Sequence, residues 1–115
     1  MKVITVLIAL VVSGCTSHLY EVNKRINAYQ YSFNGKSGDK TPEQFYKDGG
    51  GSCVDFARAK QAELGGEIVT LRQVFMQDGK PVTHAVLKVD GWLLDSRFNE
   101  IRLAALEKTY PYVGN

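Results

Sequence analysis

The sequence predicts an α+β domain in which helices come first and a small antiparallel β-meander follows. Helical periodicity and capping signals occupy the first half of the chain, whereas strand-like runs separated by Asp-Gly turns fill much of the second half. This segregation of helices and strands is typical of the α+β class. The 115-residue chain has a formal charge of only +2 and no basic stripe, so nucleic acid is not an expected partner.

The N-terminus has the pattern of an exported lipoprotein. Lys2 supplies a positive charge, residues 3–12 are an apolar run too short to span a bilayer, and small residues precede Cys15. We expect residues 1–14 to be a signal peptide and residues 15–115 to form one domain, with Cys15 lipidated. The alternatives are an ordinary signal peptide or a buried first strand or helix.

Two helices are expected before the first cysteine of the domain core. Apolar residues recur at helical spacing over residues 18–31, and a loop rich in Gly, Asn, Ser and Asp follows over residues 32–40. A short helix should then run through Lys47, because Thr41 can cap it and Pro42 suits its first position. Three glycines after Asp48 stop this helix.

A third helix is expected to begin at Cys53. Ser52 can cap it, Asp55 has the capping-box spacing, and a Gly-Gly pair follows Leu64. Three strands should come next, over residues 67–75, 82–89 and 92–95, with turns at the Asp-Gly pairs 78–79 and 90–91. We expect one last short helix within residues 99–108, and Pro111 should end regular structure.

Cys53, His84 and Asp95 follow one another on three successive predicted elements. A thiolate is favoured at a helix N-terminus by the backbone N–H groups and the helix dipole, which suits Cys53 as a nucleophile. His84 lies on a strand with apolar residues on both faces and could act as its base. Asp95 ends the next apolar run and could orient the imidazole and stabilise its charged form.

Each of these residues also has a simpler interpretation. Cys53 could be a small core residue or pair with Cys15 in a disulfide, since exported proteins usually oxidise their cysteines. His84 could be a hydrogen-bonded core histidine, and Asp95 could cap a turn or pair with Arg97. The combination of the three residues, with a Gly-Gly-Gly-Ser segment before Cys53, favours the catalytic interpretation.

The segments around these residues resemble the bacterial transglutaminase-like cysteine proteinases. The resemblance is carried by Gly51-Ser52-Cys53-Val54-Asp55-Phe56, by Thr83-His84-Ala85-Val86-Leu87 and by Leu93-Leu94-Asp95, and it extends upstream to Val22-Asn23. It implies a papain-like, transglutaminase-type core, a Cys53–His84–Asp95 triad and amide hydrolysis of envelope or cell-surface proteins. It also implies that Asn23 and Asn27 are scaffold residues that tie the first helix to a loop.

One part of the family pattern is absent from this chain. Family members usually carry acidic residues on both sides of the cysteine, and in the calcium-dependent members these help to bind the ion. Ser52 and Val54 occupy those positions here. Because Ca²⁺ needs several oxygen ligands, we expect no metal site beside Cys53, and no cofactor.

We therefore predict a monomeric, lipid-anchored thiol peptidase that acts on a protein or peptide substrate at the periplasmic or cell surface. The oxyanion would be stabilised by the Cys53 backbone N–H and by a second donor from the Tyr31–Asn34 region, which the sequence does not identify. Two alternatives remain: a transglutaminase that passes the acyl group to an amine, and a non-catalytic envelope lipoprotein that binds a partner.

Overall fold

The computed structural model describes residues 16–32, 40–77, 80–107 and 112–113. The predicted signal peptide, the lipidation site Cys15 and the predicted turn at residues 78–79 lie outside these ranges. Within them, no helix combines the length and the apolar character that crossing a bilayer requires.

The helical half of the chain follows the prediction except at the end of the first helix. This helix covers residues 16–27 of the described chain, and α2 (Pro42–Asp48) and α3 (Cys53–Leu64) follow. The predicted continuation to residue 31 is wrong, because residues 30–31 form strand β1 (Gln30–Tyr31). β1 pairs in parallel with β2 (Gly50–Gly51), and this long-range backbone pairing overrides the local helical periodicity.

The second half forms a five-stranded antiparallel sheet with the order β6-β5-β4-β3-β7. The three predicted strands are β3 (Glu67–Gln77), β4 (Lys80–Val89) and β5 (Trp92–Leu94). Two short edge strands, β6 (Arg102–Leu103) and β7 (Tyr112–Val113), complete the sheet. β4 is therefore central, as the apolar residues on both of its faces predicted.

The prediction for the C-terminal segment is right for the helix and wrong for Pro111. Residues 99–108 contain a short 3-10 helix (Ala104–Leu106), but it follows strand β6, which pairs with β5 at Trp92↔Leu103. Pro111 was expected to end regular structure, and this is wrong because β7 follows it. The free edge of β5 supplies backbone partners to this segment, and β7 pairs in the same way with β3.

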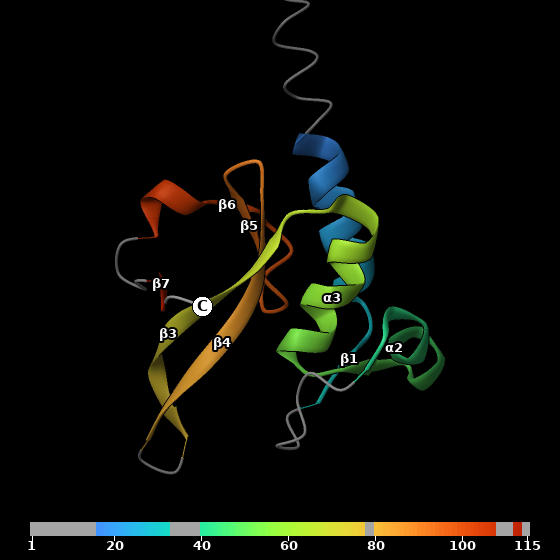
Figure 1. The fold of residues 1–115 in the computed structure, drawn as a ribbon, viewed down its shortest axis with the longest axis horizontal. Coiled ribbons are helices and arrows are strands. Elements are labelled where there is room, and N and C mark those ends of the chain that lie inside the picture. The colour runs from blue at the N-terminus through green and yellow to red at the C-terminus, as the bar shows by residue number, and fades with distance from the viewer. Residues whose placement is uncertain (1–15, 33–39, 78–79, 108–111, 114–115) are drawn as a thin grey trace, which may run out of the picture.

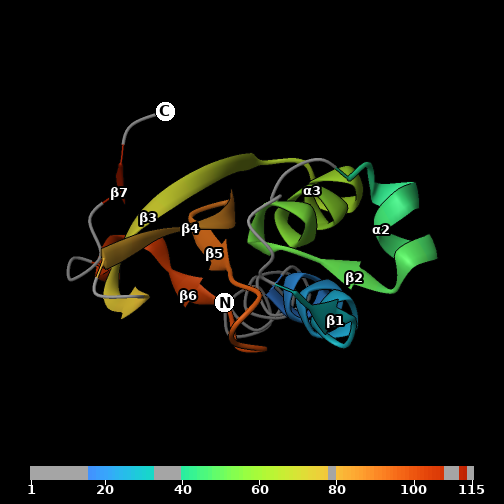
Figure 2. The ribbon, with the colours of Figure 1, turned by 90° about the horizontal axis from the view of Figure 1, so that it is seen from below.

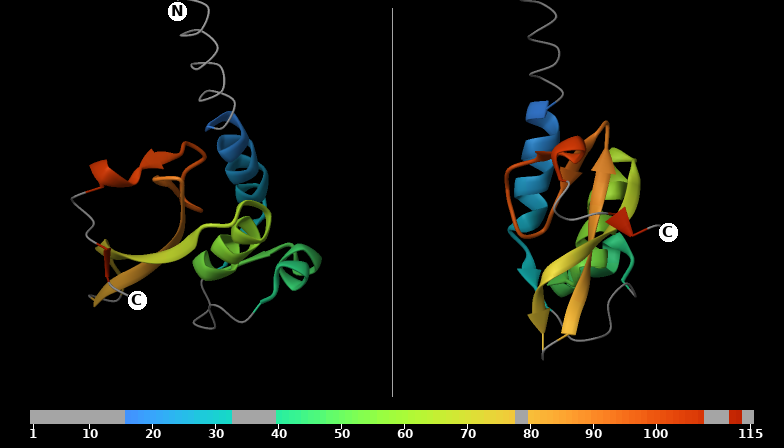
Figure 3. Two further views of the ribbon diagram at one scale, coloured as in Figure 1. Left: turned by 45° about the horizontal axis from the view of Figure 1, so that its top comes forward. Right: turned by 90° about the vertical axis from the view of Figure 1, so that its left-hand side faces the viewer.

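Helices and sheet lie side by side, with the N-terminal helix and α3 packed together against the sheet (Figures 1 and 2). One apolar cluster joins Val22 and Ile26 to Phe56 and lies among the helices. A second joins Leu19 to Leu87 and Leu94 and lies between the first helix and the sheet. Figure 3 shows α3 alongside the long strand β4, which carries His84, and the two elements are in contact.

Candidate functional site

The backbone before Cys53 is shaped by glycine and by Asp55. A Cβ on Gly50 would lie 1.9 Å from the Gln30 carbonyl oxygen, so only glycine allows β1 to approach so closely. A Cβ on Gly51 would lie 2.7 Å from a carboxylate oxygen of Asp55. That oxygen accepts a hydrogen bond from the Ser52 backbone N–H, as the predicted capping box requires, and a second one from the Ser52 hydroxyl, both at 3.0 Å. Cys53 is thereby fixed as the first residue of α3.

The Cys53 side chain is a free thiol, 7% exposed, that lies against β4 and β1. Burial raises the pKa of this thiol, but hydrogen bonds from the His84 side chain, the Ala85 backbone N–H and the Tyr31 hydroxyl outweigh that effect. The net pKa of Cys53 lies below its ordinary value. The alternative in which Cys53 forms a disulfide is therefore not realised, and the surroundings of Cys53 favour the thiolate.

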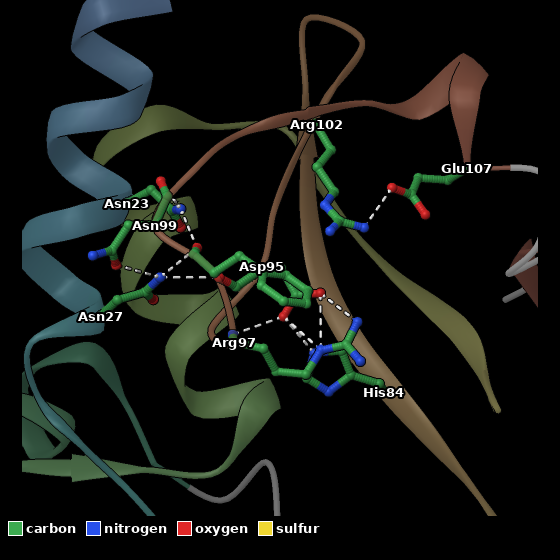
Figure 4. Close-up of polar contacts among 9 residues, drawn as sticks. Asn23, Asn27, His84, Asp95, Arg97, Asn99, Arg102 and Glu107 are labelled. Carbon is green, nitrogen blue, oxygen red and sulfur yellow. Dashed lines mark hydrogen bonds and ion pairs between the residues drawn. The ribbon is translucent and has the colours of Figure 1, made fainter. Parts of the chain in front are cut away.

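His84 is joined to Asp95 by a buried hydrogen bond of 2.7 Å between Nε2 and Oδ1 (Figure 4). Because an ionised carboxylate can only accept, Nε2 carries a proton, and Nδ1 is the ring nitrogen left for the thiol. Burial lowers the pKa of His84, yet hydrogen bonds with Asp95 and Cys53 raise it to a net value above the ordinary one. A raised histidine pKa beside a lowered cysteine pKa favours a thiolate–imidazolium pair.

Asp95 also accepts hydrogen bonds from Arg97. The Arg97 backbone N–H donates to Oδ1 at 2.8 Å, and its guanidinium contacts both carboxylate oxygens, with Nη2 2.8 Å from Oδ2. Burial raises the pKa of Asp95, but hydrogen bonds from His84 and Arg97 bring it far below its usual range. Asp95 thus makes the simple pairing with Arg97 and the contact with His84 at the same time.

The loop that carries Asp95 is tied to the N-terminal helix by two asparagines (Figure 4). Asn27 Nδ2 donates to the carbonyl oxygens of Asp95 and Phe98, both at 2.9 Å. Asn23 Nδ2 donates at 2.9 Å to the carbonyl oxygens of Phe98 and Asn99. These contacts confirm the expectation that both asparagines tie the helix to a loop, and they fix the backbone beneath Asp95.

The structure brings the three candidate residues together in one hydrogen-bonded chain from Cys53 through His84 to Asp95. The sequence did not identify two further features of this site. Tyr31 was named only as the start of a region, and it hydrogen-bonds Cys53. Lys60 was not considered, although it stands seven residues after Cys53 and thus on the same helix face, where it is fully buried.

The Asp55 carboxylate, beside which we expect no metal site, accepts hydrogen bonds from other parts of the protein. The carboxylate of Asp55 is 2% exposed, and besides the two bonds from Ser52 it accepts one from the Lys40 backbone N–H at 3.2 Å. Within the described ranges, no group of three or more His, Cys, Asp or Glu side chains is placed to hold a metal ion. Ser52 and Val54 add no carboxylate beside the thiol.

Comparison with known proteins finds solved structures that are similar to this fold. No family model and no curated protein match the chain. The structure is similar to that of calcium-bound LapG from Legionella pneumophila, with a TM-score of 0.59 and 23% identity. Two further LapG structures, one of them EGTA-treated, give TM-scores of 0.62 and 0.63, each with 26% identity.

The matched region covers 83% of this chain and 59–61% of LapG, so the chain spans about three-fifths of the length of that protein. The fold is therefore an α+β fold with a transglutaminase-like core, as the sequence predicted.

Proposed function

We propose that this chain is a thiol peptidase that hydrolyses an amide bond of a cell-envelope protein through a thioester intermediate. The observation that carries the proposal is the hydrogen-bonded chain from the Cys53 thiol through His84 to the buried Asp95 carboxylate. Nucleophile, base and orienting carboxylate have the contacts that acyl transfer needs. The similarity to LapG, a periplasmic cysteine protease with a transglutaminase-like fold, supports the same reaction class.

Acylation begins from the thiolate–imidazolium pair. The Cys53 sulfur attacks the carbonyl carbon, the C–S bond forms, and the π electrons of the carbonyl move onto its oxygen. The Cys53 backbone N–H, at the start of α3, is a donor for this oxyanion. When the intermediate collapses, the C–N bond breaks and His84 gives its proton to the leaving amine, which leaves a thioester on Cys53.

In deacylation His84 accepts a proton, whereas in acylation it donated one. Neutral His84 takes a proton from water, the water oxygen attacks the thioester carbonyl, and the C–S bond breaks to regenerate the thiolate and the imidazolium. Asp95 keeps Nε2 protonated throughout, so Nδ1 faces the reacting groups at each step. The Arg97 contacts and the Asn27 bond to the Asp95 backbone hold that carboxylate in place.

We further propose that the enzyme is anchored to the membrane by lipid on Cys15 and acts as a monomer on a protein or peptide at the periplasmic or cell surface. The support is the lipoprotein-like pattern before Cys15 and the periplasmic location of LapG. Several acyl chains on one residue would hold the protein stably, whereas a single chain gives only marginal binding.

The test is the pH dependence of Cys53 alkylation by iodoacetamide, followed by intact mass. In the wild type, alkylation should proceed well below the pH at which a free thiol of pKa ~8.5 reacts. His84→Ala should move the profile to higher pH because it removes the cation that stabilises the thiolate. Asp95→Ala should move it less in the same direction, because the ring loses its orienting partner.

His18→Ala is the matched control, since His18 is the other histidine of the chain and lies exposed on the N-terminal helix. It should leave the profile unchanged. Cys53→Ala should keep the fold and abolish the reaction. A wild-type profile like that of a free thiol, unmoved by His84→Ala and Asp95→Ala, would mean that no activated thiol exists and that the chain is a binding module.

A further inference from the structure

Tyr31 lies next to the proposed nucleophile, Cys53, and the proposed reaction has so far assigned it no role. It lies on β1, which pairs with β2 directly before the helix that begins at Cys53 (Figure 2). The Ser32 backbone N–H donates to the Gly51 carbonyl oxygen at 2.9 Å, and the Tyr31 ring packs on Phe56 with 5.8 Å between centroids. The strand and the ring contact together fix Tyr31 over the first turn of α3.

The Tyr31 hydroxyl meets two groups of the same residue. It lies next to the Cys53 side chain and the Cys53 backbone N–H, and both groups influence its pKa. That N–H is the donor expected to stabilise the oxyanion. The phenol oxygen is therefore next to both the attacking sulfur and the place where the carbonyl oxygen gains charge.

We propose that Tyr31 is a further catalytic residue, whose hydroxyl donates first to the Cys53 thiolate and then to the carbonyl oxyanion. This inference rests on the proposed acyl-transfer function. It also selects one donor from the Tyr31–Asn34 region, where the sequence predicted the second oxyanion donor without choosing a residue.

The movement of charge during attack explains how one hydroxyl serves both steps. In the resting site, the thiolate is the anion next to the Tyr31 hydroxyl. As the C–S bond forms, negative charge leaves the sulfur and develops on the carbonyl oxygen, which takes the Cys53 backbone N–H. The phenol then turns its own O–H from the sulfur to the new anion, while the ring keeps its packing on Phe56.

The hydroxyl keeps its proton over the whole working range. The pKa of Tyr31 is raised to about 12. Burial is the largest cause, and the negative charge of Cys53 and the hydrogen bond with its side chain add to it. A phenol that stays neutral near pH 7 remains a donor and does not compete with His84 as a base.

The experiment compares two reactions of Cys53 in the full chain. Iodoacetamide alkylation displaces iodide and forms no oxyanion, whereas acylation by p-nitrophenyl acetate forms one before p-nitrophenolate leaves. Both rates scale with the thiolate fraction, so their ratio at a single pH reports oxyanion stabilisation alone. Tyr31→Phe keeps the ring on Phe56 and should lower the acylation-to-alkylation ratio at least about tenfold, since loss of one oxyanion donor costs about 10²–10³ in rate.

Tyr29→Phe is the matched control, because Tyr29 packs on Phe45 and Tyr46 and has no contact with Cys53 among its described ring contacts. It should leave the ratio unchanged. An unchanged ratio in Tyr31→Phe would overturn the proposal, because the hydroxyl would then act on the thiolate only. A higher ratio would also overturn it, because the hydroxyl would then obstruct the oxyanion site. Failure of the peptidase proposal is separate, since it shows as free-thiol alkylation in the wild type.

Discussion

Lys60 gives this protein a destabilising feature whose size can be worked out. Its side chain is 0% exposed, and its Nζ is buried without a hydrogen-bond partner among the described residues. The ammonium lies 5.8 Å from the centroid of the Phe56 ring. Burial lowers the pKa of Lys60 from 10.5 to about 7, and the negative charge of Asp95 only partly opposes this.

The sign of the effect on stability follows from proton linkage. In the unfolded chain Lys60 stays protonated up to about pH 10.5, whereas in the folded chain it loses its proton near pH 7. Between these values the unfolded state binds more protons, so stability rises with pH by up to about 1.4 kcal/mol per pH unit. The full cost is present below pH 7 and is about 5 kcal/mol at most, because a water molecule at Nζ would reduce it.

Lys60→Met replaces the ammonium with an apolar side chain of similar length and should remove this cost. We expect the free energy of unfolding at pH 6 to increase by about 2–5 kcal/mol, because a buried charge without a partner is lost. The difference from the wild type should shrink steadily from pH 7 to 9.5. Urea denaturation followed by circular dichroism at a series of pH values measures both quantities.

Lys47→Met is the matched control for this series, because Lys47 lies exposed in the last turn of α2. It should change the free energy of unfolding by no more than about 0.5 kcal/mol at any pH. The reasoning is refuted if Lys60→Met lowers stability at every pH, or if it raises stability by an amount that does not depend on pH. Either result would mean that Lys60 is stabilised in the folded state by partners that lower the cost of burying its charge.

Three further predictions concern calcium binding, the Asp55 carboxylate and the lipid anchor. Calorimetric titration of the wild type at physiological salt should show no stoichiometric sub-micromolar calcium binding; a signal that Asp55→Ala abolishes would contradict this. Asp55→Ala itself should lower the free energy of unfolding by about 1–3 kcal/mol in urea melts, because buried N–H donors lose their acceptor. Cys15→Ser should move the protein from the membrane to the soluble fraction, and unmodified Cys15 in a processed, soluble wild type would count against the lipid anchor.

The sequence predicted the three proposed catalytic side chains better than the contacts that hold them. Cys53, His84 and Asp95 could be found because capping signals, strand alternation and turn residues are local patterns. The β1–β2 pairing and the β5–β6 pairing could not be found in this way, because each joins short segments that carry no strand pattern of their own. Tyr31 depends on the first of these pairings, so its place beside Cys53 appears only in the folded chain.

Lys60 was missed for a different reason. Its spacing from Cys53 places it on the buried face of α3, but charged residues are almost always exposed, so a sequence pattern assigns a lysine to solvent. Asn23 and Asn27 were found through the family resemblance alone. Their function depends on carbonyl groups about seventy residues away, which no periodicity in the first helix could indicate.

In the proposed reaction, Arg97 limits how far Asp95 weakens the His84 imidazolium as an acid. A lone buried carboxylate would raise the pKa of His84 strongly, and the ring would then be slow to give its proton to the leaving amine. The guanidinium of Arg97 contacts both oxygens of Asp95, and its charge lowers the pKa of His84 against the raising effect of that carboxylate. The short hydrogen bond from Nε2 to Oδ1 still fixes the ring. In the proposed reaction Asp95 therefore both orients the ring and raises its pKa, and the pairing with Arg97 moderates that increase while it holds the carboxylate in place.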